Sequence, residues 1–170
     1  MIIWLIGMSG AGKTTIGRLL HSELHAANPA TVYLDGDLLR EVWGEKTGHD
    51  IASRAVNAGR ISRLCAMLDR QGFDVVAAVL SIFPEWQAWN RQMFSSYFEV
   101  FLDAPMDVLR ARDTKGLYAA AAAGTEKDVV GVDIEFPRPP APDLVLDSSG
   151  AAGDPAALAT AILRSLREAR

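Results

Sequence analysis

Short runs of branched apolar residues alternate along the chain with longer stretches in which apolar residues recur every three or four positions. A short apolar run bounded by turn-forming residues predicts a buried strand. Such runs occur at Ile2–Ile6, Thr31–Leu34, Val75–Leu80, Phe98–Leu102 and Leu144–Leu146. Strands that alternate with helical segments are typical of a parallel sheet covered by helices on both faces. The pattern therefore predicts an α/β fold with a five-stranded parallel sheet.

The longer stretches follow the spacing of amphipathic helices. Between Asp50 and Gln71 the apolar positions from Ile61 to Leu68 recur at i, i+3, i+4 and i+7, so we expect a helix there that Gly72 ends. Proline suits the first turn of a helix, because its missing N–H would have no partner within the helix at that position. Further helices are predicted to begin near Gly12, Pro84, Pro105 and Pro155.

One late segment does not fit this alternation. Residues Gly116–Pro142 contain an alanine run, several glycines and a proline cluster, and they exceed the usual length of a connection. Long segments of this kind in compact domains tend to be lids or binding loops. We predict a lid at about residues 112–133, with a short helix at the alanine run Ala119–Ala123.

Composition narrows the class of protein. The 170 residues suit a single domain over residues 1–170, and the 49% hydrophobic content can sustain its core. Apolar runs are shorter than the ~18 residues of a membrane span, and the net charge of -4 disfavours nucleic-acid polymers and anionic membranes as partners. The lone Cys65 cannot form an internal disulfide, which favours a cytoplasmic location.

The first predicted strand runs directly into a phosphate-binding motif. Residues Gly7–Thr14 read GMSGAGKT and match the P-loop pattern G-x-x-x-x-G-K-[ST] between a strand and a helix. In such a loop backbone N–H groups surround phosphate oxygens, Lys13 would reach the β and γ phosphates, and Thr14 would ligate Mg²⁺. We assign ATP binding to Gly7, Ser9, Gly10, Ala11, Gly12, Lys13, Thr14 and Thr15.

Phosphate binding alone leaves several functional classes open. The N-K-x-D element that guanine-nucleotide switches use to read the base does not occur in the sequence. A large motor ATPase would need a longer chain. A compact P-loop domain with a lid favours a kinase that phosphorylates a small molecule, because that reaction must exclude water.

A pair of carboxylates follows the second predicted strand. Asp35 and Asp37 lie at its carboxyl end, the edge where ligands of open α/β sheets bind. One of them could hold a magnesium-bound water or accept a proton from an attacking hydroxyl, and Arg40 could bind an anionic acceptor. The alternative interpretation is a helix cap followed by a surface arginine.

Together these motifs resemble those of the adenylylsulfate kinase family. The resemblance covers nearly the whole chain, and it rests on the P-loop, on Asp35-Gly36-Asp37 with Arg40, and on SRAVN, Ser81, ARDTKGLY (111–118) and GVD (131–133). Members of this family are P-loop enzymes that use ATP to phosphorylate the 3′-hydroxyl of adenosine 5′-phosphosulfate. The resemblance thus implies an ATP-dependent kinase that uses Mg²⁺ and a small-molecule nucleotide substrate, and a homodimer as a candidate assembly.

The resemblance also implies roles for individual residues. Asp35 would be the magnesium-linked carboxylate and proton acceptor, with Asp37 in support. Arg112, at the start of the lid, would contact the donor adenine, and Lys115 the transferring phosphate. The catalytic set is then Lys13, Asp35, Asp37 and Lys115, and the metal ligands are Thr14 and Asp35. The acceptor-binding set is Asp37, Arg40, Arg54, Asn57, Ser81 and Lys115.

Ser81 matches a serine that is sometimes described in the family as a phosphorylated intermediate. In-line phosphoryl transfer does not need a covalent stage, and a serine that closes a buried strand more often forms hydrogen bonds. We therefore interpret Ser81 as a hydrogen-bonding residue beside the acceptor.

Several positions depart from the family pattern. Leu38 replaces the asparagine of D-G-D-N, His49 replaces the phenylalanine of G-F-S, and Val56 replaces the glutamate of E-N. The family's S-P-Y-R becomes Ser-Ile-Phe-Pro at residues 81–84, so an arginine expected near the anionic end of the acceptor is missing. A charge-assisted hydrogen bond contributes about 1.5 to 3 kcal/mol, so its loss would weaken binding of a sulfate-bearing nucleotide. Arg91, in the following helix, is a candidate to compensate.

These departures leave the acceptor open. SIFPEWQAWNR (81–91) and VVGVDIEF (129–136) also resemble a smaller branch of this fold, the cytidine diphosphoramidate kinases of bacterial capsule synthesis. Trp86 and Trp89 lie three residues apart beside the altered segment, where packing is the favoured interpretation and base stacking the alternative. A non-catalytic nucleotide-binding module is the rival from another functional class.

Overall fold

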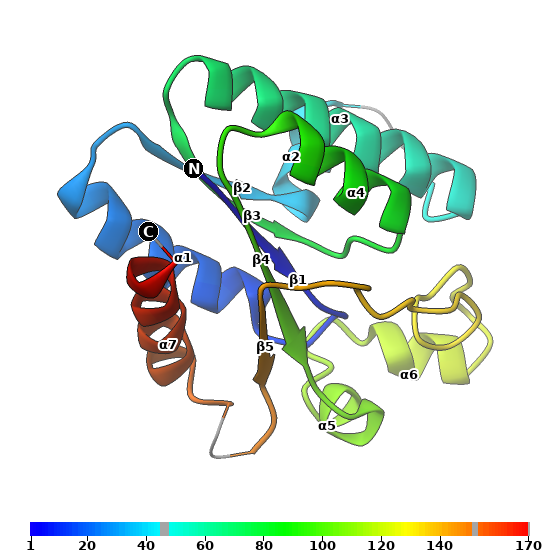
Figure 1. Ribbon diagram of the computed structural model, residues 1–170. Helices are drawn as coiled ribbons and strands as arrows, with labels where there is room; N and C mark the ends of the chain where they lie inside the picture. The colour runs from blue at the N-terminus through cyan, green and yellow to red at the C-terminus, as the bar shows by residue number, and fades with distance from the viewer. Residues whose placement is uncertain (45–47, 151–152, 170) are drawn as a thin grey trace.

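The computed structural model describes residues 1–44, 48–150 and 153–169. Within them five strands form one parallel sheet in the order β2-β3-β1-β4-β5 (Figure 1). The predicted α/β fold is confirmed, and the strands differ from the predicted ranges by a residue or so at their ends. They are β1 (Ile2–Ile6), β2 (Thr31–Asp35), β3 (Asp74–Val79), β4 (Tyr97–Asp103) and β5 (Leu144–Asp147).

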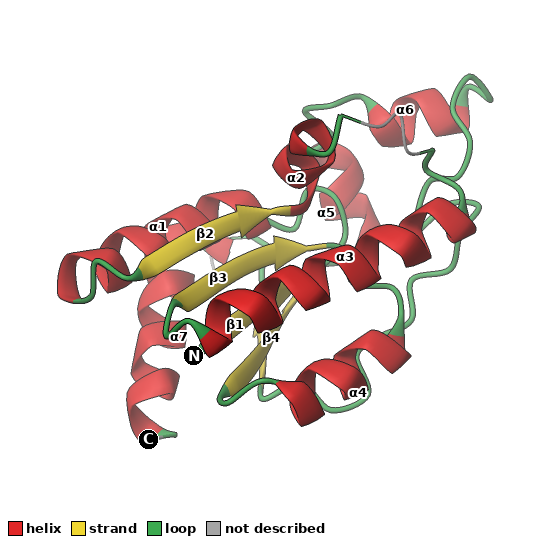
Figure 2. Ribbon diagram, turned by 90° about the horizontal axis from the view of Figure 1, so that it is seen from above, coloured by secondary structure: helices red, strands yellow, loops and turns green. Residues whose placement is uncertain are grey.

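Helices cover both faces of the sheet. Figures 1 and 2 show α3 and α4 on one face and α1 and α7 on the other, while α5 and α6 lie beyond the carboxyl ends of the strands. The helices are α1 (Lys13–Ala27), α2 (Gly36–Val42), α3 (Ile51–Arg70), α4 (Pro84–Met93), α5 (Met106–Ala111), α6 (Leu117–Ala122) and α7 (Pro155–Glu168). The short helix α2 begins directly after Asp35. The sequence predicted a helix cap at this position only as the alternative interpretation of Asp35.

The alternation along β1 divides the core into two layers. Ile3 and Leu5 pack on the side of α1 and α7, whereas Ile2, Trp4 and Ile6 pack on the side of α3 and α4. All five are at most 3% exposed, and full burial of one such aliphatic side chain contributes about 1.5 to 3 kcal/mol. The central strand therefore anchors both helical layers and fixes where its carboxyl end, the start of the phosphate loop, lies.

The long helix α3 begins and ends where the sequence indicates. The carboxylate of Asp50 caps its first turn and accepts a hydrogen bond from the backbone N–H of Ser53 at 2.9 Å. At the other end Gly72 has φ 82° and donates its N–H to the Asp69 carbonyl, which stops the helix. None of the helices in the described ranges combines the length and the apolar character that crossing a membrane requires.

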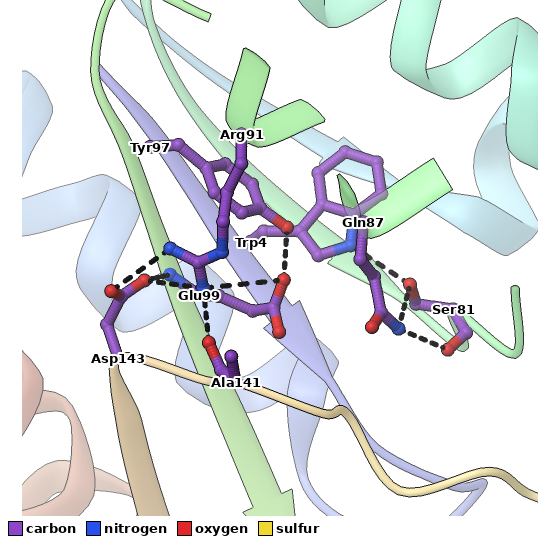
Figure 3. A network of polar contacts seen from close by, with 8 residues as sticks. All are labelled: Trp4, Ser81, Gln87, Arg91, Tyr97, Glu99, Ala141 and Asp143. Atoms are coloured by element: carbon purple, nitrogen blue, oxygen red, sulfur yellow. Dashed lines mark hydrogen bonds and ion pairs between the residues drawn. The ribbon is translucent and has the colours of Figure 1, made fainter. Parts of the chain in front are cut away.

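A polar network fixes α4 to the far edge of the sheet. Figure 3 shows the Arg91 guanidinium directed at Asp143, and an ion pair of 3.1 Å joins the two side chains. Arg91 also donates to the carbonyl of Ala141 and lies 5.1 Å from the centre of the Tyr97 ring. The sequence-based expectation that Arg91 compensates at the acceptor site is wrong, because the packing of α4 directs it to the start of β5 instead.

Glu99 lies buried at the centre of this network. Its side chain is 1% exposed and accepts a hydrogen bond from the Tyr97 hydroxyl at 2.6 Å, with Arg91 3.9 Å away. Burial raises the pKa of Glu99, and the Tyr97 hydrogen bond and the charge of Arg91 only partly oppose that shift. The folded protein therefore holds this proton more tightly than the unfolded chain does.

We predict that Glu99→Gln makes stability less dependent on pH. A carboxyl whose pKa is raised by folding costs the wild type stability as pH rises above the unfolded value of about 4.3. The neutral amide of the variant avoids this cost and can still accept from Tyr97. The difference in Tm between variant and wild type should thus become more positive from pH 4 to pH 7 in thermal unfolding. A difference that stays constant or falls would contradict the assignment.

Candidate active site

The phosphate loop joins β1 to α1 at the centre of the sheet. Gly10 and Gly12 have φ values of 81° and 89°, in the left-handed region that side chains disfavour, so glycine is required at both turns of the loop. The helix α1 begins directly after Gly12, and its positive end faces the loop. The ammonium of Lys13 folds back and donates to the Met8 carbonyl at 2.9 Å. The loop therefore presents backbone N–H groups and one cation to a single anion site.

Asp35 connects this loop to the second half of the site. One carboxylate oxygen accepts hydrogen bonds from the Thr14 hydroxyl and the Tyr33 hydroxyl, both at 2.9 Å. The other accepts from the backbone N–H of Asp37 at 2.9 Å and caps α2. The helix cap is therefore confirmed, and the same carboxylate lies at the carboxyl end of β2, where its role toward a metal or a proton stays a prediction.

The protonation of these groups follows from their surroundings. Burial alone favours the neutral acid of Asp35, but hydrogen bonds from Thr14, the Asp37 N–H and Tyr33 outweigh it and lower the pKa below its ordinary value. Burial lowers the pKa of Lys13 to about 8, although the negative charges of Asp37 and Asp35 oppose that change. At neutral pH the site thus holds an ionised carboxylate next to a predominantly protonated lysine.

The donor set fits a magnesium ion. The Thr14 hydroxyl and the Asp35 carboxylate are hard oxygen ligands that lie within hydrogen-bond distance of each other. Within the described residues there is no group of three or more His, Cys, Asp or Glu side chains able to hold a metal by themselves. Mg²⁺ commonly takes one or two protein ligands and completes its shell with phosphate oxygens and water. Thr14 and Asp35 match that kind of site.

One cavity of about 1020 Å³ brings the predicted donor and acceptor residues together. Members of the predicted sets that border it are residues 9–15 of the phosphate loop with Asp35, Asp37, Arg40, Arg54, Asn57, Ser81, Arg112 and Lys115. Gly7 is the exception. A Cβ atom there would lie 2.9 Å from the Leu102 carbonyl, so Gly7 lets the loop pack against β4 and does not border the cavity.

The lid residues reach this cavity through polar contacts. Lys115 forms an ion pair with Asp37, and Tyr118 donates its hydroxyl to the Ser9 carbonyl in the phosphate loop at 3.0 Å. Arg54, in α3, donates to the Asp128 carbonyl at 2.7 Å. Arg112 donates to the Ser148 carbonyl at 2.6 Å. The lid is therefore attached to the donor side and to the acceptor side at the same time.

Ser81 is held by two side chains in the wall of the cavity. It has φ 54°, unusual for a residue with a side chain. Its hydroxyl oxygen accepts from the Trp4 indole N–H and from the Gln87 amide, both at 3.2 Å, and its carbonyl accepts from Gln87 at 3.1 Å. These contacts fix the turn that leads from β3 into α4.

The altered residues form an uncharged part of the same wall. Ile82 is 7% exposed, and Phe83 and Trp86 border the cavity where the family pattern has an arginine. His49 borders it as well, close to Arg40 and Arg54, and burial together with these two charges lowers the pKa of its imidazole. In the described cavity lining, α2 thus supplies Arg40, α3 supplies Arg54 and the lid supplies Lys115, whereas the segment after β3 supplies no cation.

Sequence reasoning missed several residues of the site. Tyr33 supports Asp35, Tyr118 contacts the phosphate loop and Gln87 holds Ser81. Tyr33 could have been found, because residues two apart in a strand face the same side and Tyr33 precedes Asp35 by two. Tyr118 and Gln87 depend on contacts between distant segments that no local pattern reports.

A second cavity of about 910 Å³ lies between β4, α5 and residues 131–138. Met8 and Ala11 border it from the phosphate loop, but the described lining contains neither Lys13 nor Asp35. The charged groups suited to phosphoryl transfer converge on the first cavity, so we place the candidate active site there.

Comparisons with known proteins identify the family of the chain. The sequence profile of the family described as adenylylsulphate kinase matches residues 1–147. The chain is 40% identical over 148 residues to the cytidine diphosphoramidate kinase of Campylobacter jejuni subsp. jejuni serotype O:2, covering 87% of this chain and 86% of the relative. It is 39% identical over 148 residues to the adenylyl-sulfate kinase of Paraburkholderia xenovorans, covering 86% and 83%.

A solved structure extends the similarity to three dimensions. The APS kinase of Mycobacterium tuberculosis in complex with AMPPNP and APS superposes with a TM-score of 0.86 at 32% identity, covering 98% of this chain and 96% of that one. The sequence profile, the relatives and the shared fold agree over most of the chain. The chain therefore belongs to the adenylylsulphate kinase family.

Proposed function

We propose that this kinase transfers the γ-phosphoryl group of ATP to the ribose 3′-hydroxyl of adenosine 5′-phosphosulfate. The observation that carries the proposal is the single cavity in which the loop residues Lys13 and Thr14 face Asp35, with Arg40 and Arg54 on the acceptor side. The adenylyl-sulfate kinase of Paraburkholderia xenovorans and the APS kinase structure from Mycobacterium tuberculosis support this choice of acceptor. The products are ADP and the 3′-phosphorylated nucleotide.

The residues of the loop bind and orient the donor. Backbone N–H groups and the Lys13 ammonium hold the β and γ phosphates. Thr14 and Asp35 would hold Mg²⁺, which would supply positive charge to the phosphate oxygens. Asp35 receives the proton of the 3′-hydroxyl as the new P–O bond forms. A carboxylate with a lowered pKa takes that proton late, which suits a loose phosphoryl-transfer transition state.

The lid, at about residues 112–133, contributes Arg112 and Lys115 to the cavity. Lys115 lies beside Asp37, and the hydrogen bond and charge of Asp37 raise the pKa of its ammonium, so it stays cationic at neutral pH. We propose that it turns from Asp37 to the transferring phosphoryl group when both nucleotides are bound, while Arg112 contacts the donor adenine. Closure of the lid excludes water, which would otherwise compete with the ribose hydroxyl.

Cytidine diphosphoramidate is the second candidate acceptor. Ile82, Phe83 and Trp86 place apolar surface where a sulfate-binding arginine is expected, and this disfavours a nucleotide with a sulfate end group. The Campylobacter relative, which is named as a cytidine diphosphoramidate kinase, is as similar to the chain as the adenylyl-sulfate kinases are.

Three further expectations from the sequence stay predictions. They are a single domain over residues 1–170, a homodimer and a cytoplasmic location.

An ADP-release assay tests the proposed function directly. Purified protein with ATP and Mg²⁺ should release ADP faster when adenosine 5′-phosphosulfate or cytidine diphosphoramidate is added than with ordinary nucleoside monophosphates. The ratio of kcat/KM for the two acceptors identifies the preferred one. A protein that binds ATP but shows no stimulation by any acceptor would be a non-catalytic nucleotide-binding module.

Lys13→Ala should lower kcat by at least about 100-fold, because the ammonium stabilises charge that develops on the transferring phosphoryl group. Binding of the acceptor in the absence of ATP, measured by calorimetry, should change little. Lys13→Arg is the matched control, because it keeps the positive charge but replaces the compact ammonium with a planar guanidinium. Its kcat should stay strongly reduced. Equal losses of turnover and acceptor binding in Lys13→Ala would contradict the assigned role.

Two variants separate the roles of Asp35 and its support. Asp35→Asn should reduce kcat by at least about 100-fold, because asparagine is a poor magnesium ligand and base. One amide oxygen cannot both cap α2 and accept from Thr14 and Tyr33, so Tm should fall, and circular dichroism at the assay temperature checks that the variant is folded. Tyr33→Phe removes a hydrogen bond that lowers the pKa of Asp35, so that pKa rises. The acidic limb of its kcat–pH profile should therefore shift to higher pH. An unshifted limb would exclude Asp35 as the titrating group.

A further inference from the structure

The acceptor end of the cavity has two walls of different character. Arg40 and Arg54 supply positive charge from α2 and α3. The segment after β3 instead contributes Ile82, Phe83 and the half-buried indole of Trp86, none of which carries a charge. Trp86 is the largest of these side chains and the one for which sequence analysis left packing and nucleotide contact both open.

Contacts on three sides hold the Trp86 ring in place. The Arg63 guanidinium lies 5.0 Å from the ring centre, and Trp89 meets the ring edge-on at 5.5 Å with an interplanar angle of 68°. At Gly59 a Cβ atom would lie only 2.6 Å from Cζ2 of Trp86, so the ring lies directly against the backbone of α3. The indole is therefore fixed before any ligand arrives.

The contact between Trp86 and α3 accounts for a glycine in the middle of that helix, Gly59. Glycine is unfavourable inside a helix, and Gly59 lies within α3 without a left-handed φ that would require it. The Trp86 ring explains the glycine, because even a methyl group at this position would displace the indole. Arg63 stacks on the ring but is not part of the described cavity lining, so the indole separates that charge from the acceptor.

We infer that Trp86 is a specificity-determining residue of the acceptor subsite, where its indole forms a rigid uncharged wall that selects against an end group with only acceptor oxygens. A sulfate placed against this wall loses water without gaining a hydrogen-bond donor, whereas the N–H group of a phosphoramidate can lie against the aromatic face. The aromatic surface adds packing area for either nucleotide. The inference rests on the proposed nucleotide-kinase activity, and of the two candidate acceptors it favours cytidine diphosphoramidate over adenosine 5′-phosphosulfate.

The test compares acceptor kinetics of the full chain with Trp86→Leu, Trp86→Phe and Trp86→Arg. Leucine should raise the KM of the preferred acceptor about tenfold, with kcat at saturation and the KM of ATP within about twofold of wild type. Phenylalanine should restore most of the affinity. Arginine supplies the missing cation, so the kcat/KM ratio of adenosine 5′-phosphosulfate to cytidine diphosphoramidate should rise about tenfold.

Trp89→Phe is the matched control, because Trp89 holds the same ring but does not border the cavity in the described lining. It should keep the wild-type acceptor KM. Gly59→Ala should raise that KM while improving helix propensity, an effect that a purely structural defect would not give. An unchanged ratio in Trp86→Arg, or parallel increases in the KM values of ATP and acceptor in Trp86→Leu, would overturn the inference.

A direct binding measurement separates this inference from the proposed function. If wild type turns over neither acceptor, the proposed function fails, and tryptophan fluorescence is then titrated with the same two nucleotides. Quenching in wild type that disappears in Trp86→Phe supports the contact. Quenching that persists in the variant, or no quenching in wild type, overturns it.

Discussion

The hydrogen bond between the Thr14 hydroxyl and the Asp35 carboxylate joins the two halves of the site. Thr14 lies in the first turn of the helix that follows β1, whereas Asp35 ends β2, and β3 lies between these strands in the sheet. The 2.9 Å contact therefore spans a strand and fixes the phosphate loop relative to the carboxyl end of β2. Asp35 also caps α2, which carries Arg40 into the acceptor side. A single buried carboxylate thus orders the metal ligands and one wall of the cavity.

The contacts that hold the lid differ in kind from those that hold the core. Lys115 and Asp37 are about two-thirds exposed, and such surface ion pairs contribute roughly 0 to 1 kcal/mol. Tyr118 adds one hydrogen bond to the phosphate loop and Arg54 one to the lid carbonyl of Asp128. Because these lid contacts are weak, contacts with nucleotide phosphates can replace them without any change in the packing of the buried strands.

Charge within the cavity is local and uneven. The chain as a whole is acidic, yet the acceptor side gathers Arg40 and Arg54 opposite an uncharged wall at Phe83 and Trp86. Electrostatics of this kind place an anionic nucleotide in one orientation. The uncharged wall is formed by the connection from β3 to α4, which contains Phe83, and by the first turn of α4, which contains Trp86.

The sequence by itself determined the strands, the phosphate loop and the family, because each depends on local spacing: β1 and the GMSGAGKT loop are contiguous. It also placed Asp35 at a strand end. Only the tertiary structure decided the strand order, the pairing of Lys115 with Asp37, and the direction of Arg91 toward Asp143. Those contacts join segments tens of residues apart, and helix packing decides which side of α4 faces the cavity.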